Sequence, residues 1–547
     1  MKLHVTNSIA QTWGTFLLAA LLAGLLFLAQ GRSGLGLADE GFLWYGAQHT
    51  AQGEVPLRDF QSYDPGRYYW CAAGTLFFGK GLVALRFAET LFQVFGLWAG
   101  LLAARRLTRS WPLLLAIGLM LTVWMFPSHK LFDHSLLLIG IWVAVQMIEN
   151  PTRRSVFMAG CFLGLCVFFG RNHAVYNLIA QGALLLLLRF KEPTELPFAR
   201  FAQWGAGVLV GLIPIAVMLL FVPGFFAAYW ESIESIFRHG TNLSVPIPWP
   251  WRVSYAGPVL ALTSNVFRGV LFLALPIGYA SAIGYCLSLR AATLREHPVF
   301  VACAFVGMPY VHHAFSRADF SHLAQSIHPF TLGLLAALTL LGARQRYLYA
   351  AVSLLIAIAL IGPGRQMPVY QRLTSSAPWE PFDAGGTVYI PPQTRRLGNC
   401  LRRFSRENLR PDETLLIAPF TPGWYSLLDR PAPLWDLSFY FPAAKSRQER
   451  MIETLTAKNV NWAILSEDTI DGRDDLRFSA THQLVYRHLS ENFESVASPC
   501  LPRALKILRR KQPLVPNPDA GVTPAEAPSL APALPVAQRP RLRSSRG

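Results

Sequence analysis

Two adjacent carboxylates, Asp39 and Glu40, follow the first strongly apolar stretch of the sequence by a few residues. Paired acids at the boundary between membrane and water are costly unless they are solvated, paired or used. One interpretation is a general base that takes a proton from a hydroxyl or amine acceptor, in a partly buried loop that can tune its pKa. The other is an exposed acidic turn, and the pair alone does not decide between them.

Cations and imidazoles gather in three further short segments, each at the end of an apolar run. The segments are 128–134 with Lys130, 170–173 with Arg171, Asn172 and His173, and 312–322 with Arg317, Asp319 and His322. Arginine keeps its charge and offers a planar fork of donors that suits a phosphate. The alternatives are solvated or snorkelling side chains, an ion pair between Arg317 and Asp319, or a metal site, although no Cys/His spacing resembles a zinc site.

Together, an acid on one loop and cations on others describe a pocket for transfer from a phosphate-linked lipid. A base would activate the acceptor, and fixed positive charge would stabilise the phosphate leaving group, whose negative charge grows in the transition state. The lipid tail would lie between helices, which explains why such an enzyme would be embedded in a bilayer.

The composition predicts the scaffold for these residues. Of the 547 residues, 52% are hydrophobic and only 15% are charged, and the mean hydropathy is +0.32. Residues 1–363 contain 38 charged side chains, whereas the 184 residues 364–547 contain 43. This division excludes a disordered scaffold, a small disulfide-stapled secreted domain and an ordinary cytosolic enzyme. The net charge of +17 does not indicate nucleic-acid binding, because the basic residues of the apolar part lie in short gaps between apolar runs.

We expect an α-helical polytopic membrane domain over residues 1–363, with about eleven transmembrane helices. The apolar runs are 13–30, 82–104, 111–127, 131–148, 155–170, 174–190, 203–222, 264–288, 298–314, 327–342 and 347–362. The basic loops between them are 105–109, 153–154, 189–200, 290–295 and 344–346. Placing these loops in the cytoplasm satisfies the positive-inside rule, with the N-terminus inside. All five aspartates of this part, and two long loops at 31–81 and 223–263, then lie outside.

Residues 364–505 are expected to form a small extracytoplasmic α/β domain. Buried strands are predicted at 414–419 and 461–465, with an amphipathic helix at 447–459 between them. Residues 506–547 are expected to be a disordered Pro/Ala-rich tail. Cys400 and Cys500 bracket the domain and could form a disulfide if it faces an oxidising periplasm.

The sequence resembles the GT-C superfamily of integral-membrane glycosyltransferases, especially bacterial members akin to protein O-mannosyltransferases and aminoarabinose transferases. The resemblance is carried by the outward Asp39-Glu40 pair, the aromatic first loop, Arg171, the segment Arg317-Ala318-Asp319-x-x-His322, and the segments 419–425 and 429–433 of the soluble part. It covers about residues 10–500, and its motifs are short and degenerate.

This resemblance implies inverting transfer of a sugar from a polyprenyl-phosphate donor to an extracytoplasmic glycan, lipid or protein. Asp39 would be the base and Glu40 would support it or bind acceptor. Arg171 and Arg317 would hold the lipid phosphate, helped by Lys130 and His322, and Asp319, Asn172 and His173 would complete the binding site. The sequence lacks the Asp-x-Asp and Trp-Trp-Asp patterns of the oligosaccharyl branch, so no obligatory metal is expected, although some relatives need a divalent ion.

The expected location is the bacterial inner membrane, with a lipid-linked donor, an acceptor and the bilayer as partners and no nucleic acid. Two alternatives remain. A polysaccharide polymerase or ligase would also use an outward lipid-phosphate site. A transporter or flippase would need ionisable groups near the midplane and repeated broken helices, whereas Glu89 is the only acid well inside a run.

Overall fold

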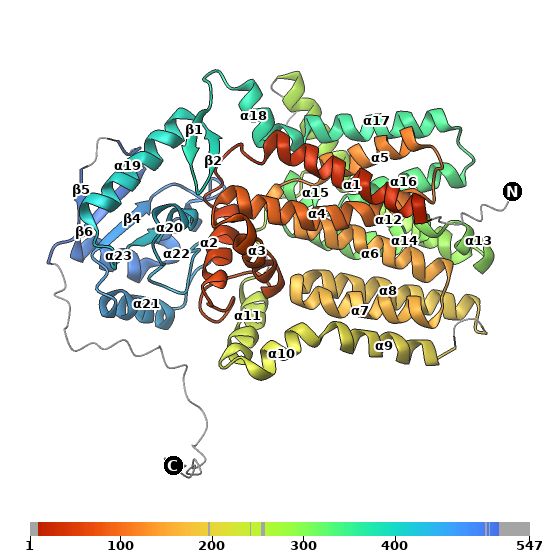
Figure 1. Ribbon diagram of the computed structural model, residues 1–547, viewed down its shortest axis with the longest axis horizontal. Helices are drawn as coiled ribbons and strands as arrows, with labels where there is room; N and C mark the ends of the chain where they lie inside the picture. The colour runs from red at the N-terminus through yellow and green to blue at the C-terminus, as the bar shows by residue number, and fades with distance from the viewer. Residues whose placement is uncertain are drawn as a thin grey trace, which may run out of the picture.

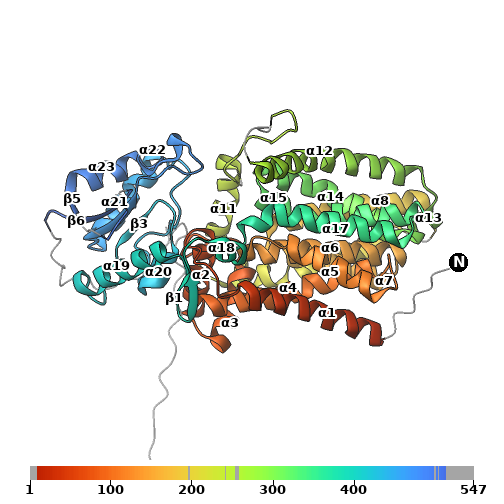
Figure 2. The same ribbon diagram turned by 90° about the horizontal axis from the view of Figure 1, so that it is seen from above.

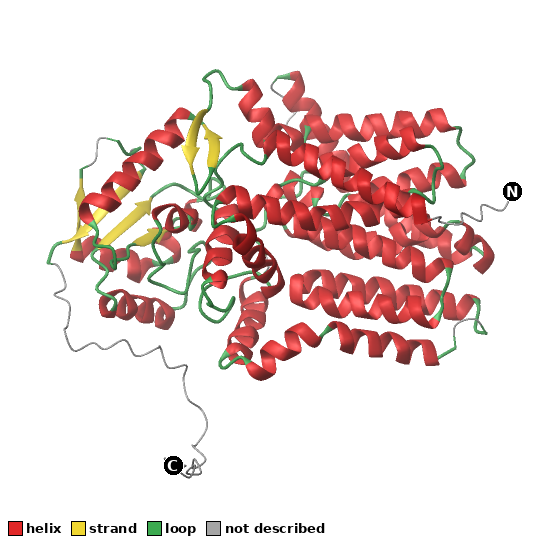
Figure 3. Cartoon of the chain, viewed as in Figure 1, coloured by secondary structure: helices red, strands yellow, loops and turns green. Residues whose placement is uncertain are grey.

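The computed structural model of the chain describes residues 9–512 apart from 195–196, 241, 253–257, 498–499 and 503. A bundle of long helices forms one end of the molecule and an α/β domain forms the other (Figure 1). Helices α2 (Asp39–Ala51), α3 (Pro65–Phe78) and α11 (Phe225–His239) lie between them. Within the described residues, the strands belong to the end that holds the α/β domain (Figure 3).

All eleven predicted apolar runs form helices. These are α1 (Ile9–Gln30), α4 (Leu82–Ala104), α5 (Trp111–Trp124), α6 (Leu131–Glu149), α7 (Arg153–Phe169), α8 (Arg171–Lys191), α9 (Ala199–Gly211) with α10 (Ile213–Phe221), α12 (Val259–Ser288), α14 (Pro298–Ser316), α16 (His328–Leu340) and α17 (Gln345–Ile361). Among the described residues, seven helices are long and apolar enough to cross a membrane, or eight if α9 and α10, bent by 51°, form one span.

The expected number of about eleven transmembrane helices is matched by a helix at every predicted run, although some of these helices are short. Helices α5 and α16 have only 14 and 13 residues, or about 20 Å at 1.5 Å per residue against a hydrocarbon core of about 30 Å. Both pack against longer neighbours, α17 and α14 respectively. Short apolar helices are stable here because neighbours cover them.

The outer face of the bundle carries large apolar side chains. Along α1, Leu17, Leu21, Leu25 and Leu28 are each more than half exposed, whereas Leu22 on the opposite face is buried. Such continuous exposed apolar surface marks a membrane interface rather than a water-facing surface. The chain is an α-helical polytopic membrane protein with a small C-terminal α/β domain.

Two glycine pairs bring α7 and α9 into close contact. A Cβ atom on Gly160 would lie 2.1 Å from the carbonyl oxygen of Trp204, and one on Gly211 would lie 2.1 Å from that of Cys161. Gly164 and Gly207 are equally tight. The two helices thus cross through the small-xxx-small packing that is typical of membrane helices.

The predicted basic loops meet at one end of the bundle. Arg106, after α4, pairs with Glu149 at the end of α6 at 2.5 Å, and Arg295 of the short helix α13 (Ala291–Glu296) pairs with Glu192 after α8. Helix α13 lies at the end remote from the α/β domain (Figure 1). The bundle therefore has a basic end and, opposite it, an end that carries the α/β domain.

The α/β domain contains two small sheets. Its strands are β1 (Glu380–Asp383), β2 (Thr387–Ile390), β3 (Leu416–Ala418), β4 (Trp462–Ser466), β5 (Phe493–Val496) and β6 (Leu505–Arg510). Strands β1 and β2 form an antiparallel pair, and the four-stranded sheet has the order β3-β4-β6-β5, with β3 and β4 parallel and the other pairs antiparallel. The helices are α19 (Pro392–Asn408), α20 (Gly423–Leu428), α21 (Lys445–Ala457), α22 (Phe478–Thr481) and α23 (Gln483–Asn492).

The predicted strands and the predicted helix of this domain are confirmed by β3, β4 and α21. The predicted end of the domain at residue 505 is wrong, because β6 continues to Arg510 and pairs with both β4 and β5. Residues 513–547 of the predicted tail lie outside the described residues. Cys400 and Cys500 form a disulfide across 100 residues of sequence.

The predicted external loop at 31–81 contains α2 and α3, and α2 and the segment between these helices dock onto the α/β domain. The start of α2 approaches α20 so closely that a Cβ atom on Gly41 would lie 2.5 Å from the backbone nitrogen of Gly423. The side-chain oxygen of Gln61 accepts hydrogen bonds from the backbone nitrogens of Leu437 and Ser438, both at 2.9 Å. These contacts fix the α/β domain relative to the segment that carries Asp39.

Candidate functional site

Asp39 is the first residue of α2, and its neighbour Glu40 anchors that helix. Both oxygens of Glu40 accept hydrogen bonds from the buried guanidinium of Arg86 in α4, at 2.7 and 2.8 Å. Burial raises the pKa of Glu40, but the charge and hydrogen bonds of Arg86, together with His129 and the Gly36 backbone, lower it overall. Glu40 is thus committed to a structural ion pair, which leaves Asp39, with its side chain 48% exposed, as the available carboxylate.

Asp39 is surrounded by polar side chains from three parts of the chain. His129 belongs to the short helix η1 (Ser128–Lys130), and its ring Nε2 lies 4.0 Å from the Asp39 carboxylate. The Tyr63 hydroxyl donates to Asp39 at 3.5 Å and accepts from the Lys130 ammonium at 2.9 Å. Burial raises the pKa of Asp39, but the charges of His129 and Lys130 lower it by more, assisted by His322 and Arg317. Asp39 is therefore held ionised.

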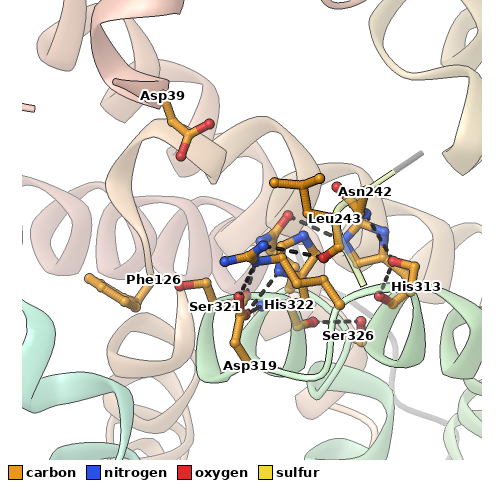
Figure 4. A network of polar contacts seen from close by, with 12 residues as sticks. Asp39, Phe126, Asn242, Leu243, His313, Asp319, Ser321, His322 and Ser326 are labelled. Carbon is orange, nitrogen blue, oxygen red and sulfur yellow. Dashed lines mark hydrogen bonds and ion pairs between the residues drawn. The ribbon is translucent and has the colours of Figure 1, made fainter. Parts of the chain in front are cut away.

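Asp319 and His322 belong to one polar network (Figure 4), and Arg317 joins it through Asp319. Arg317 donates from Nε to Asp319 at 2.7 Å, and Asp319 caps the short helix α15 (Phe320–Ala324) and accepts from the ring of His322 at 2.9 Å. Burial raises the pKa of Asp319, but hydrogen bonds from His322 and Arg317 prevail and bring it to about 2. Asp39 lies apart from this network with its carboxylate turned toward it.

The α/β domain contributes a residue that the sequence did not reveal. Both terminal nitrogens of Arg317 donate to the carboxylate of Asp471 at 2.7 Å. Asp471 and Gly472 lie in a turn with φ values of 55° and 68°, a left-handed conformation that Asp and Gly tolerate. The guanidinium fork predicted to bind phosphate is therefore bound to a carboxylate of the other domain.

Arg171 lies in a different cluster, contrary to the prediction that it converges with Asp39 and Arg317. Its guanidinium pairs with Asp64 at 2.5 Å, donates to the Ser232 hydroxyl at 2.7 Å and stacks on Tyr229 at 4.8 Å. Its backbone nitrogen also donates to Asp64, at 2.8 Å. These contacts tie the start of α8 to α3 and α11. The neighbouring Asn172 is half-buried beside it.

His173 belongs to a fully buried network between α3, α6, α8 and α14. Its Nε2 lies 2.8 Å from Asp133, and its Nδ1 lies 2.6 Å from the Tyr310 hydroxyl. Asp133 also accepts two hydrogen bonds from Arg67, at 2.7 and 2.8 Å. Because His173 and its partners are buried, this network holds helices together, and it adjoins the surroundings of Asp39 through Arg67, whose guanidinium lies 5.6 Å from the centre of the Tyr63 ring.

A cavity of about 360 Å³ lies next to Asp39 at the junction of the two domains. It is lined by Phe42, Gln61, Ser62, Tyr63, Phe420 and Tyr440. Tyr63 thus contributes both to the cavity and to the hydrogen bond with Asp39. Burial and the Asp39 charge raise the pKa of Tyr440, on which the charges of Lys130 and Arg317 also act. The sequence pointed to Tyr63 through its aromatic loop and to Phe420 through the segment 419–425 that carries the resemblance, but gave no signal for Tyr440.

Similar solved structures include two of one protein. They are ArnT from Cupriavidus metallidurans in the apo state, with a TM-score of 0.47, and the same protein bound to undecaprenyl phosphate, with a TM-score of 0.41. Each is 14% identical, and the alignment covers 92% of this chain and 98% of the other. At TM-scores below 0.5 the likeness carries no argument about the site. No protein-family model and no curated protein matches the chain.

Proposed function

We propose that this protein is an inverting membrane glycosyltransferase that moves a sugar from a polyprenyl-phosphate donor to an extracytoplasmic acceptor. One observation carries the proposal: an ionised, half-exposed carboxylate, Asp39, lies within reach of the charges of Lys130 and Arg317 beside a cavity. A base next to fixed cations is the arrangement that transfer with an anionic leaving group requires.

The chemistry follows from these positions. An acceptor hydroxyl hydrogen-bonded to Asp39 attacks the anomeric carbon on the face opposite the phosphate. The new C–O bond forms as the bond between that carbon and the phosphate oxygen breaks, and Asp39 takes the hydroxyl proton. Polyprenyl phosphate leaves with the bonding electron pair, and the developing negative charge is stabilised by the cations.

Arg317 and Lys130 are the cations that this proposal assigns to the phosphate. The planar guanidinium of Arg317 already donates two hydrogen bonds to a carboxylate. A phosphate can accept the same pair of hydrogen bonds. Lys130 donates to Tyr63, which in turn contacts Asp39. His322 orients Asp319 and through it Arg317. Arg171 and His173 are assigned structural roles, because their contacts join α8 to neighbouring helices and do not include Asp39.

The aromatic cavity is assigned to the acceptor. Phe42 and Tyr63 lie edge to face at 5.1 Å, and Phe420 and Tyr440 do so at 5.1 Å, so two aromatic pairs form its walls. Aromatic walls with a few polar groups are typical of sites for small organic ligands. The cavity thus brings an acceptor to Tyr63, the direct neighbour of Asp39.

The orientation proposed from the positive-inside rule places the basic end of the bundle in the cytoplasm of a bacterial inner membrane. Residues 1–363 then form the membrane domain, and the domain that follows lies in the periplasm with the site at the outer leaflet. The disulfide between Cys400 and Cys500 supports this side, because such bonds persist in oxidising compartments.

The test is the variant Asp39→Asn, purified and assayed with polyprenyl-phosphate sugars and with envelope extract from a deletion strain as acceptor, products being identified by mass spectrometry. Loss of a general base lowers the rate by about 10²–10⁴-fold. Asp59→Asn is the matched control, because Asp59 binds Arg58 and the Val55 backbone in the same segment. Near-wild-type transfer by Asp39→Asn, or no sugar transfer by the wild type, would remove the assignment.

A further inference from the structure

A second cavity lies between α1, α4 and the start of α6, and Arg86 of α4 is among its lining residues. Leu26 and Phe27 of α1 and Leu131 of α6 give it apolar walls, whereas Gln30 and Glu89 line it with acceptor groups. The sugar-transfer proposal does not use it, and the cavity holds the one acid that the sequence placed well inside an apolar run.

Two side chains that line this cavity have acceptor atoms without a hydrogen-bond donor among the described residues. The Glu89 side chain is fully buried, at 0% exposure, and both of its carboxylate oxygens lack a donor. The side-chain oxygen of Gln30 is also buried and lacks a donor. A buried carboxylate that is neither paired nor hydrogen-bonded is costly, so these three atoms point to a ligand that donates.

The nearby cations are already engaged with other acids. The charged groups that act on Glu89 are Glu40, Arg86, Arg67 and Lys130. Arg86 is bound by Glu40 and also donates to three backbone carbonyls, those of residues 31, 33 and 34. Arg67 is bound by Asp133 of α6, and Lys130 donates a hydrogen bond to the Tyr63 hydroxyl. Glu89 is therefore an acid that no cation or hydrogen-bond donor among the described residues binds.

The position of the cavity identifies the source of such a cation. Helix α1 lies at the edge of the bundle (Figure 2), and its outward leucines mark a surface that faces lipid. Gln30 is the last residue of α1, at the end nearest the α/β domain. That level is the membrane–water boundary, where lipid head groups lie.

We propose that this cavity binds a primary ammonium group from a membrane lipid head group, through the two oxygens of Glu89 and the side-chain oxygen of Gln30. A primary ammonium has three N–H donors, which matches three acceptor atoms without donors, and its charge balances Glu89. The apolar walls contact the methylene groups that carry the nitrogen. The proposal is independent of sugar transfer. The same chemistry could come from a small soluble amine, which the experiment separates.

The test uses the purified full chain in phosphatidylglycerol nanodiscs that contain either phosphatidylethanolamine or phosphatidylcholine. The two added lipids differ in their head group only by replacement of the N–H donors with methyl groups. Native mass spectrometry reports retained lipid and thermal unfolding reports stabilisation. We expect wild-type protein to retain phosphatidylethanolamine at least about tenfold better and to unfold at a higher temperature with it, as loss of hydrogen bonds to a charged group predicts. Equal retention of the two lipids overturns the proposal.

Two variants and one control assign the effect to the cavity. Glu89→Gln keeps the shape and removes the charge, and it should abolish the preference. Gln30→Leu, at a helix end where folding is least at risk, should weaken it. Glu234→Gln removes an acid from an exposed pair on α11 and should leave the preference intact. If Glu89→Gln and Gln30→Leu both keep the preference, the assigned acceptors are wrong.

A further arm adds ethanolamine to discs of phosphatidylglycerol alone. If ethanolamine stabilises the wild type and phosphatidylethanolamine does not, the lipid source is overturned. If only phosphatidylethanolamine stabilises it, the lipid source is supported. Because none of these measurements depends on catalysis, their failure leaves the sugar-transfer proposal untouched, and the reverse also holds.

Discussion

The variant Asp471→Asn should improve use of the lipid-phosphate donor. Asp471 of the α/β domain occupies both terminal nitrogens of Arg317, the fork proposed to bind the donor phosphate. A phosphate must displace that carboxylate before it can bind in the same geometry. Removing the negative charge of Asp471 while keeping its size weakens the competitor and leaves Arg317, still oriented by Asp319, free for the donor.

The size of this effect follows from the exposure of the pair. Two charge-assisted hydrogen bonds of 2.7 Å would be strong in a buried site, but Arg317 and Asp471 are 23% and 27% exposed, so water and salt screen them. Displacing the Asp471 carboxylate from Arg317 therefore costs the donor about 1 kcal/mol of binding free energy. This corresponds to a donor KM about fivefold lower in the variant.

The assay is initial-rate kinetics with the donor varied at saturating acceptor. The acceptor KM should change little, because the aromatic cavity is left intact. Asp475→Asn is the control, since Asp475 pairs with Arg473 in the same turn and should have no effect on the donor KM. A donor KM that rises in Asp471→Asn would show that Asp471 supports the site and would refute the displacement argument.

Three further outcomes are expected. Asp39 must be ionised to act as a base, and its pKa is lowered in the free protein. The value of kcat/KM should therefore fall only as the pH drops below the usual aspartate pKa near 4. A fall in kcat/KM at pH 6–7 that is absent from Asp39→Asn would contradict this direction of the pKa shift. Transfer should survive EDTA, because side chains supply the positive charge; loss restored by a divalent ion would contradict that. In Gly164→Val the new Cβ would lie 2.3 Å from the Val208 carbonyl oxygen, so the variant should lose about 1–3 kcal/mol of stability and unfold at a lower temperature. In the control Gly182→Ala the new Cβ points into open space, and the unfolding temperature should not fall.

Hydrophobic runs and basic loops predicted most of the membrane domain. Every apolar run forms a helix, because a run of that length has no other way to satisfy its backbone in an apolar environment. The run at 203–222 is an exception in shape, since it breaks at Leu212 into two helices. The sequence offers Pro214 just beyond the break, but a proline near a helix start does not by itself predict a bend of 51°.

The site was predictable only where its residues lie close in sequence. Asp319 and His322 are three residues apart, so their contact through a helix cap could be anticipated. The pairings of Glu40 with Arg86 and of Arg317 with Asp471 join segments 46 and 154 residues apart. Nothing in the local pattern distinguishes these partners from other charges, which is why Glu40 was expected to act in catalysis and Asp471 went unnoticed.

The lowered pKa of Asp39 is at first sight a poor property for a base, because a strongly ionised carboxylate takes a proton weakly. The causes of the lowering resolve part of the difficulty, since two of the four groups that depress the pKa after burial has raised it, Lys130 and Arg317, are assigned to the donor phosphate, and the other two are His129 and His322. A bound phosphate brings negative charge against Lys130 and Arg317 and offsets their effect on Asp39. Donor binding therefore makes Asp39 more basic in the complex that needs a base, and leaves it ionised and weakly basic without donor. The pH dependence of kcat reports the pKa of Asp39 in the complex, and that of kcat/KM reports it in the free protein. The acid limb of kcat should therefore lie at higher pH than the acid limb of kcat/KM. If the two limbs coincide, Lys130 and Arg317 do not contact the donor phosphate.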